Sequence, residues 1–554
     1  MSLRSRPGAD VPVLTAQVAR ASNPRGTTAM WVRDRLEGLW RDEDFASWYS
    51  KDGKPGLSPA QLATVSVLQF LLNLSDRQAA EAVRCRIDFK YALGLDLHDP
   101  GFHHSVLSDF RDRIAAEGRA DELFDLALRR LRKAGLLKGN RGRQRTDSTY
   151  VLAAARELTR LELVLEAVRA TLEETVHIAS DILDDLVDEG WALRYGRQVR
   201  LVSQPSHPAT RMRQAAADAA ELLQRLRQVR PVLPPAAEVL RQILVQHFTA
   251  DRHGKLRPRT DKDGQPPTPQ RLESPYDPEA RYVRRGHHTW TGYLAHTTET
   301  CDDNSVNVIT DVATTPPTRD LTALPGIHAR LRRRRLLPAE HLVDGGYMSV
   351  AQLDAAARDH RIRLIGPLAD NTSPQHRAKD GFGRESFQID FDKRQVTCPN
   401  REVTSVWQDL PVAEPTQVLV RFDARQCGRC PKKPDCTPGP FRSLYFPPRH
   451  RHELQARNRA DQQDPDWQRL YASRSGIEGT MNELVNGHQM RRCRYRGTAK
   501  THAQHVLTAI AINIERLSSQ EPADSAYRPR PPTAFQRYLD QRELPRPRWW
   551  RQGA

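Results

Sequence analysis

Apolar residues recur at helical spacing along the first 140 residues of the chain. Ser58 and Pro59 precede the apolar stretch QLATVSVLQFLLNL, and Gln61 stands three residues after Ser58. Ser75 and Gln78 repeat this spacing at the start of SDRQAAEAVRCR. A Ser-x-x-Gln pair is a capping box, and proline is favoured at the first position of a helix. The pattern predicts an all-helical domain over residues 1–140, in which these two helices form either a helix-turn-helix or part of a plain bundle.

A short strand follows in RTDSTYVLAA, where Asp147 lies on the same face as Thr149 and Val151. Apolar residues then recur at steps of three and four over 158–172, which predicts an amphipathic helix with one buried face. That face packs either against another helix of the chain, the more ordinary arrangement, or across a dimer. Residues 228–277 contain many prolines, so we expect mostly loop around one helix near 237–247.

From Tyr282 onward the pattern becomes that of strands. HTWTGYLAHTTET and SVNVITDVATTPP alternate β-branched and polar residues. A helix is expected over about 320–334, then an apolar strand ending on Asp344, another helix and the strand IRLIGPL. Alternating strands and helices of this kind predict a mixed α/β sheet of about five strands.

The predicted elements divide the chain into four parts. The helical domain covers 1–140 and is expected to bind DNA. An α/β domain covers 141–370 and 447–518, with a helical or loop insertion at about 152–275. Within it, helices are expected at about 471–485 and 499–517. Residues 371–446 form a Cys-rich insertion, called the Cys-rich segment below. The Pro- and Arg-rich tail 519–554 is expected to be mostly disordered.

The charge of the chain points to a polyanionic partner. Its 554 residues carry 85 Lys and Arg against 68 Asp and Glu, a formal net charge of +17 with a pI near 9.8. The preference for Arg over Lys is ascribed mainly to base composition of the gene, which leaves the net charge unexplained. The chain has neither a signal peptide nor an apolar run long enough for a membrane span, so we expect a cytoplasmic, nucleoid-associated protein with no membrane partner.

Three carboxylates stand where an α/β sheet exposes side chains at one edge. Asp147 lies in a strand, Asp344 ends another, and Glu478 lies on a predicted helix. Phosphodiester hydrolysis uses two divalent cations held by such hard oxygen ligands. Tyr471, Arg474 and Glu478 are spaced by three and four residues and would share a helix face, where the arginine could orient the carboxylate or form a simple surface ion pair.

These motifs resemble the DDE transposases of bacterial insertion sequences, specifically the group numbered eleven-eighty-two, related to the insertion-sequence-five superfamily. The resemblance covers roughly residues 30–518, through RTDSTYVLAAARELTRLELV, YDPEARY, TGYLAHTTET, LVDGGY and RSGIEGTMNELVNGHQMRRCRYRG. It implies an RNase H-like catalytic core with a catalytic and metal-binding triad at Asp147, Asp344 and Glu478. Two Mg²⁺ ions, or Mn²⁺, would be its cofactors.

The family's Tyr, Arg, Glu and Lys signature is matched at Tyr471, Arg474 and Glu478. Its lysine is replaced by Val485. His488, Arg491 or Arg492 could hold the terminal phosphate in its place. Glu483 competes as the third carboxylate, but five residues turn it onto another helix face.

Four of the seven cysteines fall within the Cys-rich segment. Four thiolates can close a tetrahedral zinc site, and the segment has little apolar sequence for a core of its own. We expect a structural Zn²⁺, with free buried thiols as the alternative, at Cys398, Cys427, Cys430 and Cys436.

A basic loop follows the predicted Glu478 helix. Its cations would neutralise the strand being cut, and its tyrosine could stack on an unpaired base. The expected DNA contacts are Tyr471, Arg474, Arg491, Arg492, Arg494, Tyr495, Arg496 and Lys500. A second basic run, RLRRRRLLP at 330–338, is either a further contact or a solvated helix end.

The sequence therefore predicts a transposase that binds the terminal inverted repeats of its element on double-stranded DNA, as a homodimer or higher homo-oligomer. It would catalyse metal-dependent strand cleavage and strand transfer. The alternative is an inactive or domesticated copy that acts as a DNA-binding repressor or architectural protein. A zinc hydrolase acting at the cysteines is disfavoured, because four cysteine ligands leave no open coordination position.

Overall fold

Local capping fixes the start of several helices in the N-terminal third. In the computed structural model the Ser75 backbone N–H donates to Gln78 Oε1 (2.9 Å) and the Gln78 N–H donates back to Ser75 Oγ (3.3 Å), so the predicted capping box is confirmed. Ser58 also caps its helix, but the Gln61 side chain donates to the Leu93 carbonyl instead (2.8 Å). The structure describes all residues except 1, 4–9, 140, 156–157, 199–206, 253, 265, 268–269, 286–287, 304, 318–319, 370–380, 411–416, 521–531 and 545–554.

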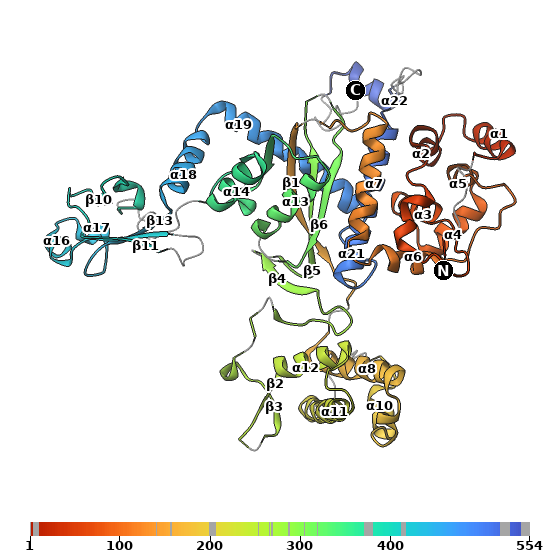
Figure 1. Ribbon diagram of the computed structural model, residues 1–554, viewed down its shortest axis with the longest axis horizontal. Coiled ribbons are helices and arrows are strands. Elements are labelled where there is room, and N and C mark those ends of the chain that lie inside the picture. The colour runs from red at the N-terminus through yellow and green to blue at the C-terminus, as the bar shows by residue number, and fades with distance from the viewer. Residues whose placement is uncertain are drawn as a thin grey trace.

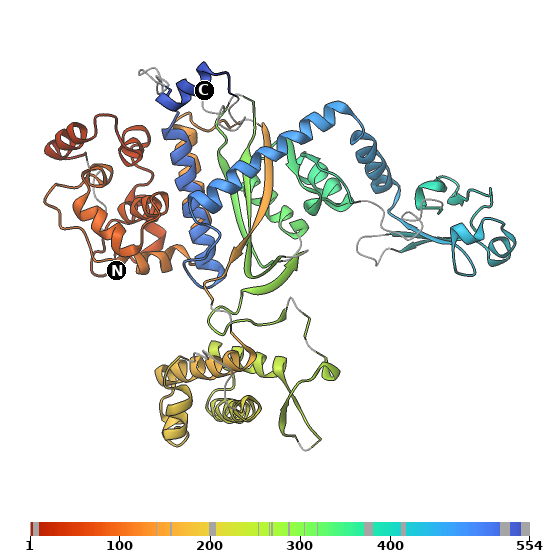
Figure 2. The same cartoon turned by 180° about the vertical axis from the view of Figure 1, so that it is seen from behind.

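The N-terminal region is helical and packs on a helix from the far end of the chain. That helix is α21 (Thr498–Ser518), which contacts α2, α3, α6 and α7. Phe70 and Phe124 share one hydrophobic core with Ile510 and with residues of the central sheet. Figures 1 and 2 show these helices against one side of the molecule. They are α1 (Val13–Ser22), α2 (Thr28–Leu36), α3 (Pro59–Leu71), α4 (Asp76–Cys85), α5 (Ile87–Leu93), α6 (Ser105–Ile114) and α7 (Arg119–Lys133).

The expected mixed sheet is present. β6, β5, β1, β7 and β8 lie in that order, and β4 pairs with the start of β5. β5 runs antiparallel to both β1 and β6, whereas β7 is parallel to β1 and β8 is parallel to β7. The strands are β1 (Arg143–Leu152), β4 (Arg281–Arg285), β5 (His288–Thr300), β6 (Ile309–Thr315), β7 (Glu340–Val343) and β8 (Arg363–Ile365).

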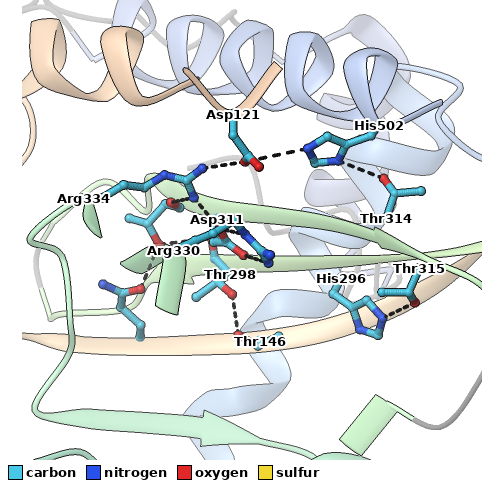
Figure 3. A network of polar contacts seen from close by, with 12 residues as sticks. Asp121, Thr146, His296, Thr298, Asp311, Thr314, Thr315, Arg330, Arg334 and His502 are labelled. Atoms are coloured by element: carbon cyan, nitrogen blue, oxygen red, sulfur yellow. Dashed lines mark hydrogen bonds and ion pairs between the residues drawn. The ribbon is translucent and has the colours of Figure 1, made fainter. Parts of the chain in front are cut away.

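Helices α13 (Leu324–Arg333) and α14 (Val350–His360) follow β6 and β7 and pack beside the sheet. Buried polar groups join α13 to the strands: Arg330 donates to Asp311 of β6, and His328 contacts His341 of β7 (2.9 Å). α7 joins the same network, because Asp121 lies between Arg334 and His502 of α21 (Figure 3). Burial raises the pKa of Asp121, but the nearby His502 and Arg334 outweigh it and hold that pKa well below its ordinary value.

The segment between β1 and β4 forms a helical unit with its own core, seen below the sheet in Figure 1. The apolar face of α8 packs on α11 and α12 of the same chain, which is the more ordinary of the two expected arrangements. The expectation of mostly loop over 228–277 is wrong in part, because a β2–β3 hairpin follows α12. The elements are α8 (Arg160–Ile178), α9 (Asp181–Asp184), α10 (Glu189–Tyr195), α11 (Pro208–Val229), α12 (Pro235–His247), β2 (Phe248–Ala250) and β3 (Leu256–Pro258).

The Cys-rich segment projects from the other side of the sheet (Figure 1). Despite the little apolar sequence expected for a core, it has a small hydrophobic core that includes Phe387, Val420 and Phe446. Its described elements are β9 (Gln388–Asp390), β10 (Gln395–Thr397), β11 (Val406–Leu410), β12 (Gln417–Arg421), α16 (Ala424–Arg429), α17 (Lys433–Cys436) and β13 (Ser443–Phe446). Helices α18 (Arg449–Asp461) and α19 (Pro465–Ala472) lead the chain back to the sheet.

The helix expected over 471–485 is broken. α19 ends at Ala472, a 3₁₀ turn covers Ser473–Gly476, and α20 (Ile477–Asn482) runs into a π-helical turn at Glu483–Gly487. In the tail, the short helix α22 (Ala534–Gln541) is described where disorder was expected, and 521–531 and 545–554 lie outside the described residues. None of the helices among the described residues is long and apolar enough to cross a membrane.

Candidate active site

Asp147 lies in β1, and Asp344 directly follows β7, the parallel strand beside it. β1 pairs with β7 in a register that places Thr146 beside Val343, and each aspartate is the next residue along its chain. Asp344 follows directly after β7, where its carboxylate accepts a hydrogen bond from the Gly346 backbone N–H (3.0 Å). The strand pairing therefore brings to one sheet edge two carboxylates that are 197 positions apart in the sequence.

Arg474 joins this pair from the 3₁₀ turn before α20. Its Nη1 lies 3.1 Å from Asp147 Oδ2, and both side chains are about one-fifth exposed. Burial raises the pKa of Asp147, while the Ser148 backbone N–H and Arg474 oppose that rise. Burial also raises the pKa of Asp344, and the negative charges of Asp147 and Asp320 raise it further. The carboxylates thus repel each other in a setting that favours a bound cation.

Asp320 is a third acidic group at this edge, and sequence reasoning did not find it. It opens a 3₁₀ turn (Asp320–Thr322), accepts a hydrogen bond from Ser148 Oγ (2.9 Å) and pairs with Arg285 (3.2 Å). A Cβ placed on Gly346 would lie 3.0 Å from Asp320 Oδ2 and 3.1 Å from Asp344 Oδ1, so these oxygens flank the glycine. A side chain at this position would therefore press on both carboxylates.

A buried ionic cluster fastens the Arg474 turn and α20 to the sheet. Glu299 of β5 is fully buried and pairs with Arg145 of β1 (2.7 Å) and Arg516 of α21 (2.9 Å). Thr480 of α20 donates to the same carboxylate (2.6 Å). Arg145 also donates to the Ser473 carbonyl (2.7 Å), so the turn that carries Arg474 is tied to β1 itself.

Glu478 is the second residue of α20, and its side chain is exposed. α20 contacts β1, and the 3₁₀ turn separates Glu478 from Tyr471, so the two do not share one continuous helix face. Within the described part of the chain, no group of three or more His, Cys, Asp or Glu side chains is arranged to hold a metal ion. The structure unites Asp147, Asp344 and Arg474, and the role of Glu478 as the third ligand stays a prediction.

The Tyr471 ring stacks on Trp467 (5.0 Å between centroids). Burial raises the pKa of Tyr471, Arg474 lowers it, and the charges of Asp344 and Asp147 raise it. Arg474 lies 6.0 Å from the centre of the Tyr471 ring. Glu483, the competing carboxylate, forms an ion pair with Arg516 (2.7 Å). That pairing gives Glu483 a structural partner in the cluster around Glu299.

Most side chains of the predicted DNA-binding loop have partners within the protein. Tyr495 lies under Arg111 (3.9 Å from the ring centre), and Arg494 lies over Phe70 (4.7 Å) and donates to the Leu74 carbonyl. These contacts attach the loop to the N-terminal helices. The other members are Arg491 over Tyr150 (3.8 Å), Arg496 over Tyr276 (4.9 Å), Lys500 paired with Asp112 (2.5 Å) and the exposed Arg492.

His488 is not placed to hold a terminal phosphate. It is buried, its Nε2 lies 2.8 Å from Glu515, and its Nδ1 lies 3.2 Å from the Phe70 carbonyl. Its imidazole therefore fastens the π-helical turn to α3 and α21. Of the suggested substitutes for the family's lysine, Arg491 and Arg492 remain.

The four cysteines of the Cys-rich segment line one hollow of about 30 Å³. Burial raises the pKa of Cys436, Arg442 lowers it, and the other three cysteines raise it again. All are free thiols and none of them forms a closed metal site as arranged. The structure brings the predicted ligands together and leaves zinc binding as a prediction for Cys398, Cys427, Cys430 and Cys436.

Two segments of the chain match known protein families. Residues 397–518 match the family described as "Transposase DDE domain", and residues 20–113 match "Transposase domain (DUF772)". The first match includes Arg474, Glu478 and the four cysteines, whereas Asp147 and Asp344 lie outside both matches. No curated protein and no solved structure matches the chain. Over these two segments, which together make up less than half of the chain, the protein is similar to transposase domains, and its mixed α/β fold is consistent with that similarity.

Proposed function

We propose that this protein binds the terminal inverted repeats of its insertion sequence, hydrolyses the phosphodiester at the 3′ ends and joins the freed 3′-hydroxyls to target DNA. The observation that carries the proposal is that Asp147 of β1 and Asp344, directly after the adjacent parallel strand β7, lie at one edge of the sheet, with Arg474 paired to Asp147. An antiparallel β6–β5–β1 set continued by parallel β7 and β8 supports an RNase H-like core. The sequence motifs around Asp147, Asp344 and Glu478 favour the insertion-sequence group numbered eleven-eighty-two.

Divalent cations fit the chemistry of this edge. Asp147 and Asp344, with Glu478 as third ligand, offer hard oxygen donors. Burial raises the pKa of both aspartates, and neighbouring aspartates raise it further. Two bound Mg²⁺ or Mn²⁺ ions would activate the attacking oxygen and neutralise the leaving 3′-oxygen. The residues themselves hold the site in shape: Arg474 orients Asp147, and Gly346 leaves room for both neighbouring carboxylates.

The proposed partner is double-stranded DNA. We propose that the protein binds it as a homodimer or higher homo-oligomer, in the cytoplasm and associated with the nucleoid. The net charge of +17 favours a polyanion. Tyr471, Arg474 and the exposed Arg492 are the proposed contacts nearest the cut strand, and Arg491, Arg494, Tyr495, Arg496 and Lys500 shape the loop beside them. We also propose a structural Zn²⁺ at the four cysteines, because they line one hollow.

A donor-plasmid excision assay tests the function in cells. The wild-type protein should excise its element, and Asp344→Asn should abolish excision while leaving binding to the inverted repeat intact. A wild-type protein that binds the repeat but never excises would establish the repressor alternative. Excision by the Asp344→Asn variant at the wild-type level would contradict the proposed site.

A further inference from the structure

A polar hollow of about 450 Å³ lies between α7 and α13, and neither the proposed catalytic chemistry nor the family matches account for it. α7 supplies one wall, and the C-terminal end of α13 with the residues after it supplies the other. We call it the α7–α13 pocket. Its lining residues are Asp125, Leu128, Arg129, Arg132, Arg333, Arg334, Arg335 and Leu336.

The floor of the pocket is fixed by a buried arginine. Arg334 is almost completely buried and is bound by the carboxylates of Asp121, Asp125 and Asp311. Figure 3 shows its guanidinium between Asp121 and Asp311. Its charge is satisfied within the protein, so Arg334 is a structural element and contributes little free charge to the pocket.

The walls carry more positive charge than the protein neutralises. Arg333 pairs with Asp125 (3.1 Å), the only acidic residue that lines the pocket among the described residues. The side chains of Arg129 and Arg335 are exposed, and within the described part of the chain neither guanidinium has an ion pair or a hydrogen bond. Two guanidinium groups therefore face a concave surface without a counter-charge.

Arginines near helix ends also neutralise the negative pole of the helix. Arg132 has that role here, because its Nη2 donates to the carbonyls of Arg334 (3.3 Å) and Arg335 (3.2 Å). Its Nε is buried and lacks a hydrogen-bond partner. Arg132 thus already neutralises the negative end of the helix. Arg129 and Arg335 are not required for that role.

We propose that the α7–α13 pocket binds a backbone phosphate of duplex DNA, held by Arg129 and Arg335. Planar guanidinium donors match phosphate oxygens well, and such contacts position a duplex without reading its sequence. Leu336 of the pocket precedes β7 and Asp344 follows it, and at about 3.3 Å per residue the strand alone spans roughly 13 Å. The pocket is therefore a second DNA contact, distant from the cut strand, and it rests on the proposed function only in requiring that the protein binds DNA.

The test compares two double variants of equal charge. Arg129→Gln/Arg335→Gln removes the two free pocket arginines, and Lys133→Gln/Arg332→Gln removes two exposed cations of the same helices that do not line the pocket. Each variant must unfold at the wild-type temperature, which these exposed positions should allow. Binding to a labelled duplex of about three helical turns, at about 10 base pairs per turn, is then measured over a range of NaCl concentrations.

The pocket variant should bind about tenfold more weakly, as expected when charge-assisted hydrogen bonds are removed. The slope of its logarithmic affinity against logarithmic salt concentration should fall by about 0.9 for each phosphate that the protein no longer neutralises, and the control variant should shift much less. The same difference should persist in the Asp344→Asn background, because the pocket does not act on the cut bond.

Equal behaviour of the two double variants would overturn the pocket while leaving DNA binding by the wild type intact. Absence of duplex binding by the wild type would overturn the proposed function itself. A further measurement compares unfolding temperatures with and without inorganic phosphate. If phosphate raises the unfolding temperature only when Arg129 and Arg335 are present, yet both double variants bind DNA equally, the pocket is a free-phosphate site and the proposal fails.

Discussion

Arg474 Nη1 lies 3.1 Å from Asp147 Oδ2, and this contact joins β1 to a turn more than 300 residues later in the chain. Arg474 opposes the burial that raises the pKa of Asp147. It therefore favours the charged form of the carboxylate at the edge where Asp344 also lies. The contact links the sheet to the segment that carries Glu478.

Replacing Arg474 should impair cleavage more than DNA binding. In Arg474→Gln the pKa of Asp147 rises further, because one opposing charge is removed, and the carboxylate no longer has its orienting partner. We expect a fall of about 100-fold in the single-turnover cleavage rate, the size typical of one preorganised donor. Arg469→Gln, on the exposed part of α19, is the matched control. Equal rates for both variants would exclude a role for Arg474.

Gly476 should not tolerate a side chain, whereas Gly479 should. A Cβ on Gly476 would overlap Arg145 Nη1, and that guanidinium holds both Glu299 and the Ser473 carbonyl. Gly476→Ala should therefore lower the unfolding temperature and the cleavage rate together. Gly479 has open space around its Cβ position, so Gly479→Ala should leave stability unchanged or raise it by up to about 1 kcal/mol. Equal unfolding temperatures for the two variants would show that the cluster does not constrain this turn.

The raised pKa values of Asp147 and Asp344 predict a pH-dependent cost to stability. A carboxyl whose pKa is higher in the folded state holds its proton more tightly there, so its stabilising effect is complete at low pH and is lost as pH rises through the folded pKa. At neutral pH and without divalent metal, Asp344→Asn should therefore unfold at a higher temperature than wild type. The difference should shrink as pH falls below the raised pKa of Asp344. A variant less stable than wild type at neutral pH would contradict this interpretation.

Divalent metal should reverse the order of the unfolding temperatures, so that the wild type unfolds above Asp344→Asn. Mg²⁺ or Mn²⁺ should raise the unfolding temperature of the wild type, because binding to the folded state alone stabilises it, and should do so much less for Asp344→Asn. Calorimetry at several metal concentrations measures the shift. Identical shifts in both proteins would place the cation elsewhere.

The Cys-rich segment should contain one zinc ion per chain. Metal analysis of the purified protein checks the stoichiometry, and a zinc chelator should lower the unfolding temperature of this segment. Cys427→Ser should release the metal, whereas Cys85→Ser, at an exposed cysteine outside the segment, should retain it. If the purified wild-type protein contains no zinc and the chelator leaves its unfolding temperature unchanged, the four cysteines are free thiols.

Features set by neighbouring residues could be predicted from the sequence. The capping box at Ser75 is formed by residues three apart, and α21 follows the apolar spacing of its own sequence. The alternating pattern from Tyr282 likewise predicted β5 and β6, and a short apolar run predicted the strand that leads to Asp344. Asp147 and Asp344 were identified through the motifs around them, and the sheet then brought them together.

Features set by distant residues could not be predicted. The helix expected over 471–485 breaks at Ser473, whose carbonyl accepts a hydrogen bond from Arg145, a residue more than 300 positions earlier. Asp320 reaches the site through its contacts with Ser148 and Arg285, and no local motif marks it. Tyr495 lies in a basic loop, which predicts a contact with DNA, but Arg111 of the N-terminal helices covers its ring.

Cleavage of a duplex carrying the element's end, with Mg²⁺ in a purified reaction, tests the central claim most directly. The proteins to compare are Asp147→Asn, Asp344→Asn, Glu478→Gln and, as the matched control, Glu483→Gln, whose carboxylate pairs with Arg516. We predict that the first three bind the duplex and leave it uncut, whereas Glu483→Gln cleaves it. Cleavage at the wild-type rate by Asp147→Asn or Asp344→Asn would contradict the account.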